Sequence, residues 1–205
     1  MIAIIDYDAG NIRSVEKALE YLGEKVVVTR DKDAIKTADK VVLPGVGAFG
    51  DAMNNLKKYE LEQVIYEVIE NGIPFLGICV GLQLLFEESE ESPGVSGLGI
   101  LKGKILRFPD KKGFKVPHMG WNSLHFKNNG RLFYNMKEEE YVYFVHSYYL
   151  KAQEESIVKA TASYSTPIDA SIEKDNLFAC QFHLEKSSKT GLKILRNFVE
   201  LKGGK

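Results

Sequence analysis

Apolar and polar residues alternate in two different ways through the first part of the chain. Short unbroken apolar runs, rich in β-branched residues, predict buried strands. Between these runs, apolar residues recur at the three- and four-residue spacing of a helix that covers a core with one face. Strands are expected at residues 2–5, 26–28, 41–43 and 73–78, and helices at residues 12–22 and from about 49 to 70 with a break near Tyr59.

This alternation of strand and helix is typical of a parallel sheet covered by helices on both faces. From Gly97 onward the pattern changes, because strand-like segments follow one another without long helices between them. These segments lie at about residues 98–107, 141–149, 156–163, 168–173 and 177–182. We therefore expect an α/β fold with a largely parallel sheet, antiparallel additions in the C-terminal half and a final helix at about 188–201. Because no repeat or linker divides the chain, residues 1–205 are predicted to form one domain.

The composition excludes several classes of protein. Hydrophobic residues make up 44% of the 205 positions, which is enough for a substantial core. With 27 basic and 28 acidic residues the net charge is −1, so no general attraction to nucleic acid or to an anionic membrane is expected. Two cysteines are too few for a disulfide framework, and neither a signal peptide nor a membrane-spanning run is visible. A cytoplasmic protein is therefore expected.

Cys79 lies between an apolar strand and a helix-like stretch, in the segment Gly77-Ile78-Cys79-Val80-Gly81. This arrangement is typical of a nucleophile elbow, with a thiol in place of the usual serine. Glycines two residues before and after the cysteine allow the chain to turn sharply without side-chain clashes. The turn would expose Sγ, and the N-terminus of the following helix would favour the thiolate. Cys79 is therefore predicted to be the nucleophile of an acyl-transfer reaction.

His183 and Glu185 follow the strand-like segment 177–182 and are candidates for the partners of this nucleophile. A thiolate needs a base, and the base needs a group that orients it. Residues two apart in an extended chain point the same way, so these two side chains share a face. We expect His183 to move protons and Glu185 to fix its tautomer. The alternative, a surface histidine at a strand end, leaves the cysteine elbow without a base.

The loop Gly45-Val46-Gly47-Ala48-Phe49-Gly50 matches the GxGxxG pattern of dinucleotide binding. Its position argues against a dinucleotide, because it follows the third strand instead of the first and is preceded by Pro44. Glycines also let backbone N–H groups approach a reacting carbonyl oxygen, which makes an oxyanion hole the better interpretation. Its donors are expected from Val46, Gly47 and Val80.

Other polar features have structural interpretations. The acidic run at residues 87–91 is predicted to be a solvated loop, because no interleaved histidine completes a metal site. His118 and His125 do not form an arguable ligand pair. Cys180 lies in an apolar, β-rich segment and is expected in the core. We expect no metal and no cofactor.

Taken together, the Cys79 elbow, the loop 44–47 and His183-x-Glu185 resemble the class I glutamine amidotransferases, over essentially the whole chain. The resemblance implies a flavodoxin-like fold. It also implies that Cys79 attacks the side-chain amide of glutamine, releases ammonia and forms a glutamyl thioester, which water then hydrolyses with the help of His183. The family usually has proline after the histidine, where this chain has Leu184. Because proline restricts φ, the leucine implies an active but less rigid triad.

Three further segments, at residues 6–11, 117–122 and 143–149, are similar to one subfamily, the glutaminase subunits of imidazole glycerol phosphate synthases of histidine biosynthesis. In that subfamily ammonia passes to a separate (β/α)8-barrel cyclase subunit, so a heterodimer is implied. The implied glutamine-binding positions are Gly45, Gln83, Glu91, Ser147 and Tyr148, and the implied positions at the partner interface or its gate are Asn11, Trp121, Tyr143 and Lys186.

The resemblance also implies that the oxyanion hole is completed only when the partner binds its substrate, so that the isolated chain hydrolyses glutamine slowly. Three alternatives stay open at this point. The chain could be the glutaminase of another synthase, such as pyridoxal phosphate or anthranilate synthase. It could be a cysteine peptidase or hydrolase on a similar sheet, or a catalytically weakened scaffold. Neither a nucleic-acid nor a membrane partner is expected.

Overall fold

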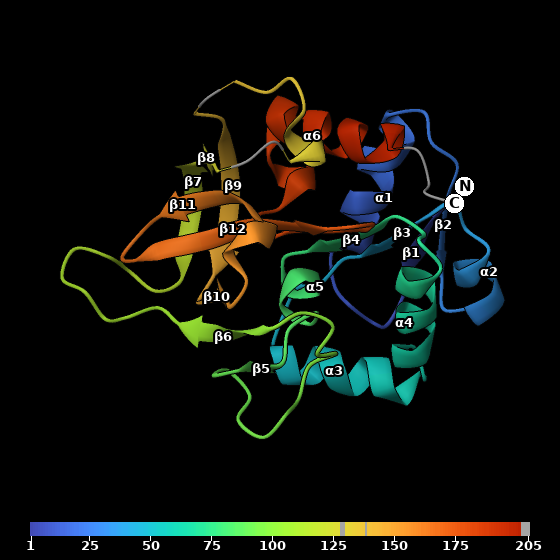
Figure 1. Cartoon of the computed structure of the whole chain (residues 1–205), viewed down its shortest axis with the longest axis horizontal. Coiled ribbons are helices and arrows are strands. Elements are labelled where there is room, and N and C mark those ends of the chain that lie inside the picture. The colour runs from blue at the N-terminus through green and yellow to red at the C-terminus, as the bar shows by residue number, and fades with distance from the viewer. Residues whose placement is uncertain (128–129, 138, 202–205) are drawn as a thin grey trace.

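The computed structural model describes residues 1–127, 130–137 and 139–201. Its centre is an eight-stranded sheet in the order β2-β1-β3-β4-β13-β12-β11-β8 (Figure 1). The strands are β1 (Ile2–Ile5), β2 (Val26–Thr29), β3 (Lys40–Leu43), β4 (Phe75–Ile78), β8 (His125–Phe126), β11 (Val158–Ser163), β12 (Pro167–Lys174) and β13 (Leu177–Cys180). Pairs from β2 to β13 are parallel, and those from β13 to β8 are antiparallel. The predicted fold class is confirmed.

Strand β13 is the point at which the sheet changes from parallel to antiparallel. It runs parallel to β4, with Cys180 opposite Ile78, and antiparallel to β12. The prediction that segment 177–182 adds an antiparallel strand was therefore wrong for its pairing with β4. The parallel pairing brings the carboxyl ends of β4 and β13 to the same edge of the sheet, which is where open α/β sheets bind ligands.

Two other predicted strand segments belong to smaller sheets instead of the central one. The region around 141–149 forms two strands that separate at Ser147, and each pairs with a different partner. The sequence pattern did not indicate this division. These sheets consist of β5 (Glu88–Ser89), β6 (Gly103–Arg107) and β10 (Tyr148–Ala152), and of β7 (His118–Ser123) with β9 (Tyr141–His146).

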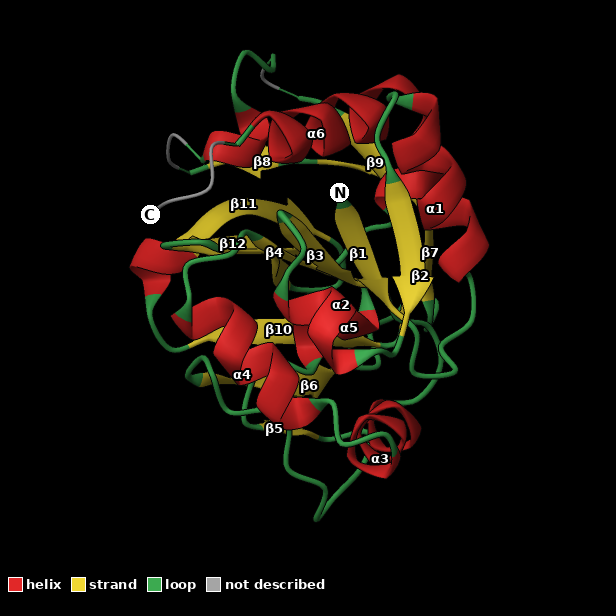
Figure 2. Ribbon diagram, turned by 90° about the vertical axis from the view of Figure 1, so that its right-hand side faces the viewer, coloured by secondary structure: helices red, strands yellow, loops and turns green. Residues whose placement is uncertain are grey.

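Helices cover both faces of the central sheet, with α1 and α6 on one face and α3, α4 and α5 on the other (Figures 1 and 2). The predicted break near Tyr59 is confirmed, because α3 ends at Lys58 and Glu60 has a φ of 53°. Helix α2 was not predicted, although Asp31 caps it by accepting from Ala34 N. The helices are α1 (Ile12–Tyr21), α2 (Lys32–Lys36), α3 (Phe49–Lys58), α4 (Glu62–Glu70), α5 (Val80–Gln83) and α6 (Ser188–Glu200), with 3-10 turns η1 (Arg131–Phe133), η2 (Glu155–Ile157) and η3 (Leu184–Lys186).

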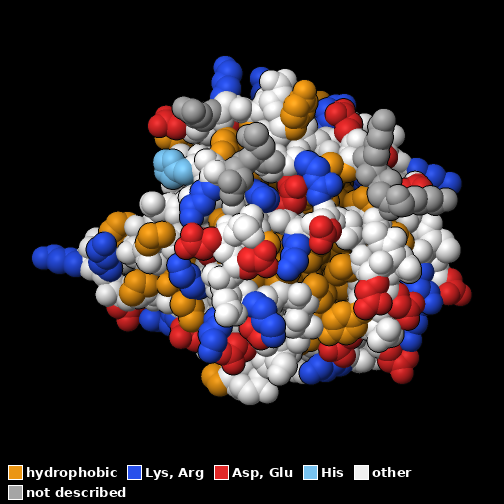
Figure 3. Space-filling view, in the orientation of Figure 1, with side chains coloured by type: hydrophobic (Ala, Val, Ile, Leu, Met, Phe, Trp, Pro, Cys, Tyr) orange, Lys and Arg blue, Asp and Glu red, His pale blue; other side chains and the backbone are white. Residues whose placement is uncertain are grey.

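The core explains why the apolar runs of the sequence are unbroken. Every residue of β1, β4 and β13 is buried, as expected for parallel strands with helices on both sides. On the face shown in Figure 3, basic and acidic side chains are interspersed, in keeping with the balanced charge of the chain. Among the described residues, none of the helices has the length and apolar character needed to cross a bilayer.

Candidate active site

Cys79 occupies a sharp turn between β4 and α5. Its φ of 56° and ψ of −109° lie in a region that side-chain-bearing residues rarely adopt. A Cβ on Gly77 would come within 2.7 Å of the Gly81 carbonyl oxygen, and one on Gly81 within 2.0 Å of the Leu43 carbonyl oxygen. Both flanking glycines are therefore required by close backbone contacts, and the turn predicted from the sequence is present. Because α5 spans only four residues, its dipole is smaller than a long helix would provide.

His183 lies between Cys79 and Glu185. Its Nδ1 is 2.8 Å from Glu185 Oε1, and both side chains are almost fully buried. Burial by itself disfavours the imidazolium, but hydrogen bonds and charge interactions with Cys79 and Glu185 outweigh it and raise the pKa of His183 to about 9. The raised pKa favours a positively charged imidazole next to the Cys79 sulfur and the Glu185 carboxyl group, which is an arrangement suited to nucleophilic catalysis.

Glu185 receives a second hydrogen bond from Asn11. The Asn11 Nδ2 donates to Oε1, the same oxygen that faces His183, at 2.5 Å. Oε2 is buried and has no hydrogen-bond partner within the described part of the chain. Asn11 precedes α1 with a φ of 68°, a left-handed conformation that asparagine tolerates better than most residues. The side chain expected at the partner interface thus also contacts the carboxylate behind His183.

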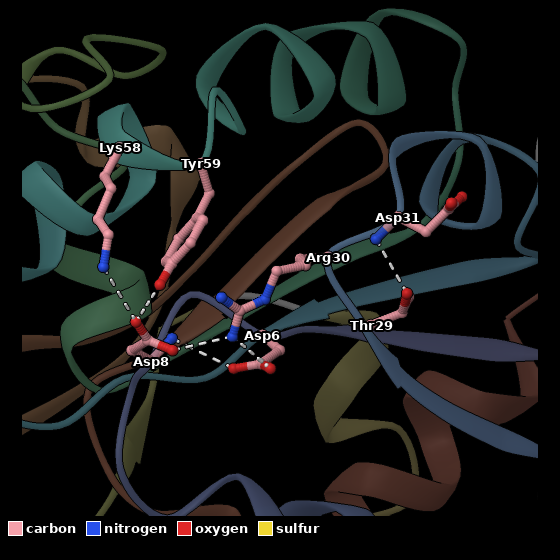
Figure 4. Close-up of polar contacts among 7 residues, drawn as sticks. All are labelled: Asp6, Asp8, Thr29, Arg30, Asp31, Lys58 and Tyr59. Atoms are coloured by element: carbon pink, nitrogen blue, oxygen red, sulfur yellow. Dashed lines mark hydrogen bonds and ion pairs between the residues drawn. The ribbon is translucent and has the colours of Figure 1, made fainter.

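A charged cluster anchors the loop between β1 and α1, which contains Asn11 (Figure 4). Arg30 Nη2, after β2, lies 2.7 Å from Asp6 Oδ2 and 2.8 Å from Asp8 Oδ1. Its guanidinium lies 4.1 Å from the Tyr59 ring centroid, and the Tyr59 hydroxyl donates to Asp8. The Tyr59 hydrogen bond and the adjacent Arg30 hold the pKa of Asp8 below its usual value. The cluster ties the loop to β2 and to the end of α3.

A cavity of about 410 Å³ opens at Cys79, a size that suits a small molecule. It brings together most of the residues predicted from the sequence, although they come from loops far apart in the chain. A small hollow that shares Asn11, Val46 and His183 with it also contains Gly45 and Glu185. Trp121 and Tyr143 line neither space. The predicted residues that line the main cavity are Asn11, Val46, Gly47, Cys79, Val80, Gln83, Glu91, Ser147, Tyr148, His183 and Lys186.

One of the predicted oxyanion donors is engaged in a hydrogen bond within the protein. The Val80 N–H donates to the Gly45 carbonyl oxygen at 3.3 Å, so this donor is engaged within the protein. The peptide between Gly45 and Val46 therefore turns its carbonyl, and not its N–H, toward Val80. The Tyr7 hydroxyl holds the preceding residue by donating to the Pro44 carbonyl oxygen at 2.6 Å. Burial and the proximity of Cys79 raise the pKa of Tyr7, so its hydroxyl stays a donor.

Two side chains predicted to bind glutamine also have contacts within the protein. Gln83 Nε2 donates to the Tyr148 carbonyl oxygen at 3.2 Å and to Gln181 Oε1 at 3.0 Å. Glu91 Oε2 accepts from the Phe49 N–H at 2.8 Å, which caps the N-terminus of α3. Both side chains are thereby held in fixed positions at the wall of the cavity.

The strand pair β7–β9 joins an exposed aromatic surface to the backbone of His183. Trp121 lies opposite Tyr143 in this pair, with their ring centroids 5.9 Å apart. Trp121 is 53% exposed and Met119 is 61% exposed. The backbone carbonyl oxygen of Tyr143 accepts a hydrogen bond from the His183 N–H at 3.0 Å. A partner that binds this surface at Trp121 would therefore be connected to His183 through Tyr143 alone.

Sequence reasoning missed two features of the site. Gln181 is fully buried, and its Nε2 lies 3.8 Å from Cys79 Sγ; its only sequence signal is its place between Cys180 and His183. His118 pairs with His146, Nδ1 to Nε2 at 2.9 Å, and not with His125. No cluster of His, Cys, Asp and Glu suited to a metal ion occurs among the described residues.

Leu184 and Cys180 are both fully buried. Leu184 begins η3 and is fully buried, and His183 still reaches Glu185 across it. Cys180 lies in the core as expected, and burial raises the pKa of its thiol to about 12. Of the two cysteines, Cys79 is thus the one that faces the cavity.

The fold and the cavity define a class of enzyme that the comparisons with known proteins identify. The family model of the class-I glutamine amidotransferases matches residues 3–201, and the chain belongs to this family. It is 51% identical to the imidazole glycerol phosphate synthase subunit HisH of Methanocaldococcus jannaschii, over 98% of this chain and 100% of that protein. The HisH subunits of Aquifex aeolicus and Bacillus subtilis are 53% and 49% identical, over 95% and 98% of this chain and 94% and 96% of theirs.

Solved structures support the same fold at lower sequence identity. A crystal structure described as a glutamine amidotransferase is 20% identical and covers 100% of both chains with a TM-score of 0.76. The PurLQS structure from Thermotoga maritima is 22% identical, covers 97% of this chain and 96% of that one, and has a TM-score of 0.73. At these identities the likeness concerns the fold alone.

Proposed function

We propose that this chain is the glutaminase subunit of an imidazole glycerol phosphate synthase and supplies ammonia for histidine biosynthesis. The observation that carries the proposal is the identity of about one half, over nearly the whole length, to curated subunits of that enzyme. The geometry around Cys79 supports it, because a thiol and an imidazole line a cavity of suitable size and a carboxylate is hydrogen-bonded to the imidazole.

In the proposed reaction the Cys79 thiolate attacks the side-chain carbonyl carbon of glutamine. The carbonyl π electrons move to oxygen, and the C–N bond then breaks as His183 gives its proton to the leaving ammonia. Water adds to the resulting thioester while His183 takes a proton from it, the C–S bond breaks, and glutamate leaves. Glu185 keeps the Nδ1–H of His183 in place and stabilises the imidazolium.

We infer that two of the three predicted oxyanion donors, the N–H groups of Val80 and Val46, are not yet available in this arrangement. The Val80 N–H is occupied by the Gly45 carbonyl oxygen, and the Val46 N–H belongs to the same peptide group. Rotating that peptide would release Val80 and turn the Val46 N–H toward the cavity. Gly45 and Gly47 flank Val46, and Gly47 already has a φ of 95°, so the rotation is compatible with the backbone. This peptide rotation is the proposed switch: the enzyme becomes active only when an event outside the cavity, such as substrate binding by the partner, drives the rotation.

The partner in this proposal is a (β/α)8-barrel cyclase subunit that forms a heterodimer with this chain. The exposed β7–β9 surface around Trp121 is the candidate contact, since it connects through Tyr143 to the backbone of His183. Asn11 and Lys186, at the cavity, are the candidate gate residues. The expected cytoplasmic location belongs to the same proposal, and cell fractionation tests it.

The decisive measurement is glutamate release from glutamine by three mixtures: the chain alone, the chain with the cyclase subunit, and both with the ribonucleotide substrate of the cyclase. We expect turnover chiefly in the third mixture, and its loss in Cys79→Ala, which should still bind the cyclase. Cys180→Ala is the matched control and should retain turnover. Equal turnover in all mixtures would refute the switch, while failure to bind the cyclase would refute the pathway assignment and leave the thiol chemistry standing.

A further inference from the structure

We propose that Gln181 is a positioning residue for the nucleophile: its side-chain amide donates a hydrogen bond to Cys79 Sγ, and so stabilises the thiolate and fixes its direction. The inference rests on the proposed role of Cys79 and adds a residue to that site. Gln181 Nε2 lies 3.8 Å from Sγ, within the range of a hydrogen bond to sulfur. His183 also interacts with Cys79, and this interaction helps to raise the pKa of the imidazole.

The position of Gln181 is well determined by the fold. It is the first residue after β13, and its N–H donates to the Ala170 carbonyl oxygen at 2.9 Å. β13 is parallel to β4, so Gln181 follows Cys180 just as Cys79 follows Ile78. The side chain is fully buried. Burying an amide is costly unless its polar atoms find partners, so contacts at both ends of this side chain matter.

The orientation of the Gln181 side-chain amide follows from hydrogen-bond partners whose donor or acceptor roles are fixed. The Tyr148 carbonyl oxygen can only accept, so the Gln83 atom 3.2 Å from it must be the amino group. The same amino group lies 3.0 Å from the other end of Gln181, which must therefore be the oxygen Oε1. The amino group of Gln181 is consequently the end that faces Sγ.

A second donor to the Tyr148 carbonyl oxygen extends this chain of hydrogen bonds. His146 Nδ1 lies 2.8 Å from that oxygen and so carries a hydrogen, and His146 Nε2 accepts from His118 Nδ1 at 2.9 Å. Burial lowers the pKa of His146 to about 3 and that of His118 to about 4, so both rings are neutral near pH 7. Each tautomer is thereby defined, and the chain connects β7 to the sulfur through Gln83 and Gln181.

A neutral donor at the sulfur serves the reaction at two points. It stabilises the thiolate before attack, because hydrogen bonds to a charged acceptor are stronger than those to a neutral one. It does so again when the C–S bond of the thioester breaks and the sulfur leaves with the electron pair. Unlike His183, the amide neither gains nor loses a proton in either step, so it acts through the position and charge of the sulfur alone.

The test compares Gln181→Met, which has a similar length and no donor, with Gln181→Glu, which is isosteric and places an acceptor near the sulfur. Gln153→Glu, at an exposed position, is the matched control. Two readouts are needed: the rate of Cys79 alkylation by iodoacetamide against pH, and kcat and KM for glutamine in the complex with the cyclase. Cys79→Ala provides the background from Cys180. His183 and Tyr7 are the titratable groups that interact with Cys79, and neither residue is changed in any of these variants.

We expect the alkylation midpoint to rise by about one pH unit in Gln181→Met, equivalent to about 1.4 kcal/mol, and further in Gln181→Glu. We expect kcat to fall by about tenfold or more with KM nearly unchanged, because a hydrogen bond to a charged group is lost. An alkylation profile in folded Gln181→Met that coincides with that of the unchanged protein would overturn the inference. Alkylation does not require glutamine turnover, so a failure of the proposed function would appear separately, as absent turnover in the unchanged complex.

Discussion

The two sides of the cavity differ in how far their polar groups are prepared for reaction. On the side formed by β4 and β13, His183 and Glu185 are buried, hydrogen-bonded to each other and directed at Cys79. On the side of the glycine loop, the Val80 N–H is turned to the Gly45 carbonyl oxygen. In the proposed mechanism, proton transfer is thus preorganised, whereas stabilisation of the oxyanion is withheld. Since oxyanion donors contribute about 10² to 10³ in rate, an enzyme can be held inactive without disturbing its nucleophile.

The preorganised side is tested most strongly by Glu185→Gln. We expect kcat to fall by about four orders of magnitude, as when the carboxylate of a comparable triad becomes an amide. Because Glu185 helps to raise the pKa of His183 to about 9, the activity of the unchanged complex should persist to that pH and then fall as the imidazolium is lost. In the variant this alkaline limb of kcat/KM should move to lower pH. Glu20→Gln, exposed on α1, is the control, and an unmoved limb would contradict the assignment.

Asn11→Asp tests whether the carboxylate depends on its second donor. The substitution keeps the shape and the tolerance for a left-handed backbone, but it replaces the donor to Glu185 Oε1 by an acceptor. We expect kcat to fall by about 10- to 100-fold, from a lost charged hydrogen bond and added repulsion. The control is Asn54→Asp, at an exposed position of α3. If the affinity for the cyclase fell while kcat at saturating cyclase stayed unchanged, Asn11 would act at the interface alone.

Tyr7→Phe should loosen the glycine loop, so that its oxyanion donors become available more easily. The two sides of the cavity would then differ less in how far they are prepared for reaction. It removes the hydrogen bond to the Pro44 carbonyl oxygen that holds the glycine loop. We expect glutamine turnover by the isolated chain to rise by up to about fivefold, the equivalent of one hydrogen bond of about 1 kcal/mol. The free energy of unfolding should fall by a similar amount. Tyr21→Phe, with its side chain exposed, should change neither quantity, and unaltered basal turnover in Tyr7→Phe would show that the loop is held by other contacts.

The smallest effect is expected for Leu184→Pro, which restores the usual residue of the family. Leu184 is the first residue of η3, a position where proline is tolerated. The variant loses a buried apolar side chain but also restricts the unfolded chain, so the free energy of unfolding should fall by only about 1 kcal/mol. Turnover should stay within about threefold, since this is under 1 kcal/mol at the site. A large gain in kcat would mean that the leucine weakens the triad after all.

Local chemistry in the sequence was enough to predict the elements nearest the nucleophile. The apolar runs before Cys79 and before His183 predicted buried strands, and glycines at 77 and 81 permitted the turn that the structure contains. The expectation that His183 and Glu185 share a face assumed an extended chain, and this was wrong: residues 184–186 form the 3-10 turn η3, within which the two side chains still meet. Strand β7 was missed because its residues, among them His118, Gly120 and Asn122, do not form an apolar run, and the strand forms by pairing with the distant β9.

Sequence alone determined the class of fold and indicated a candidate nucleophile with its candidate partners, because these depend on periodicity, on glycine geometry and on intrinsic reactivity. Only the tertiary structure decided that β13 runs parallel to β4, and with it that Cys79, Gln181 and His183 meet. The same holds for the Asn11 contact with Glu185, which spans 174 positions. Contacts between distant segments depend on how strands are ordered in the sheet, and no local pattern in the sequence encodes that order.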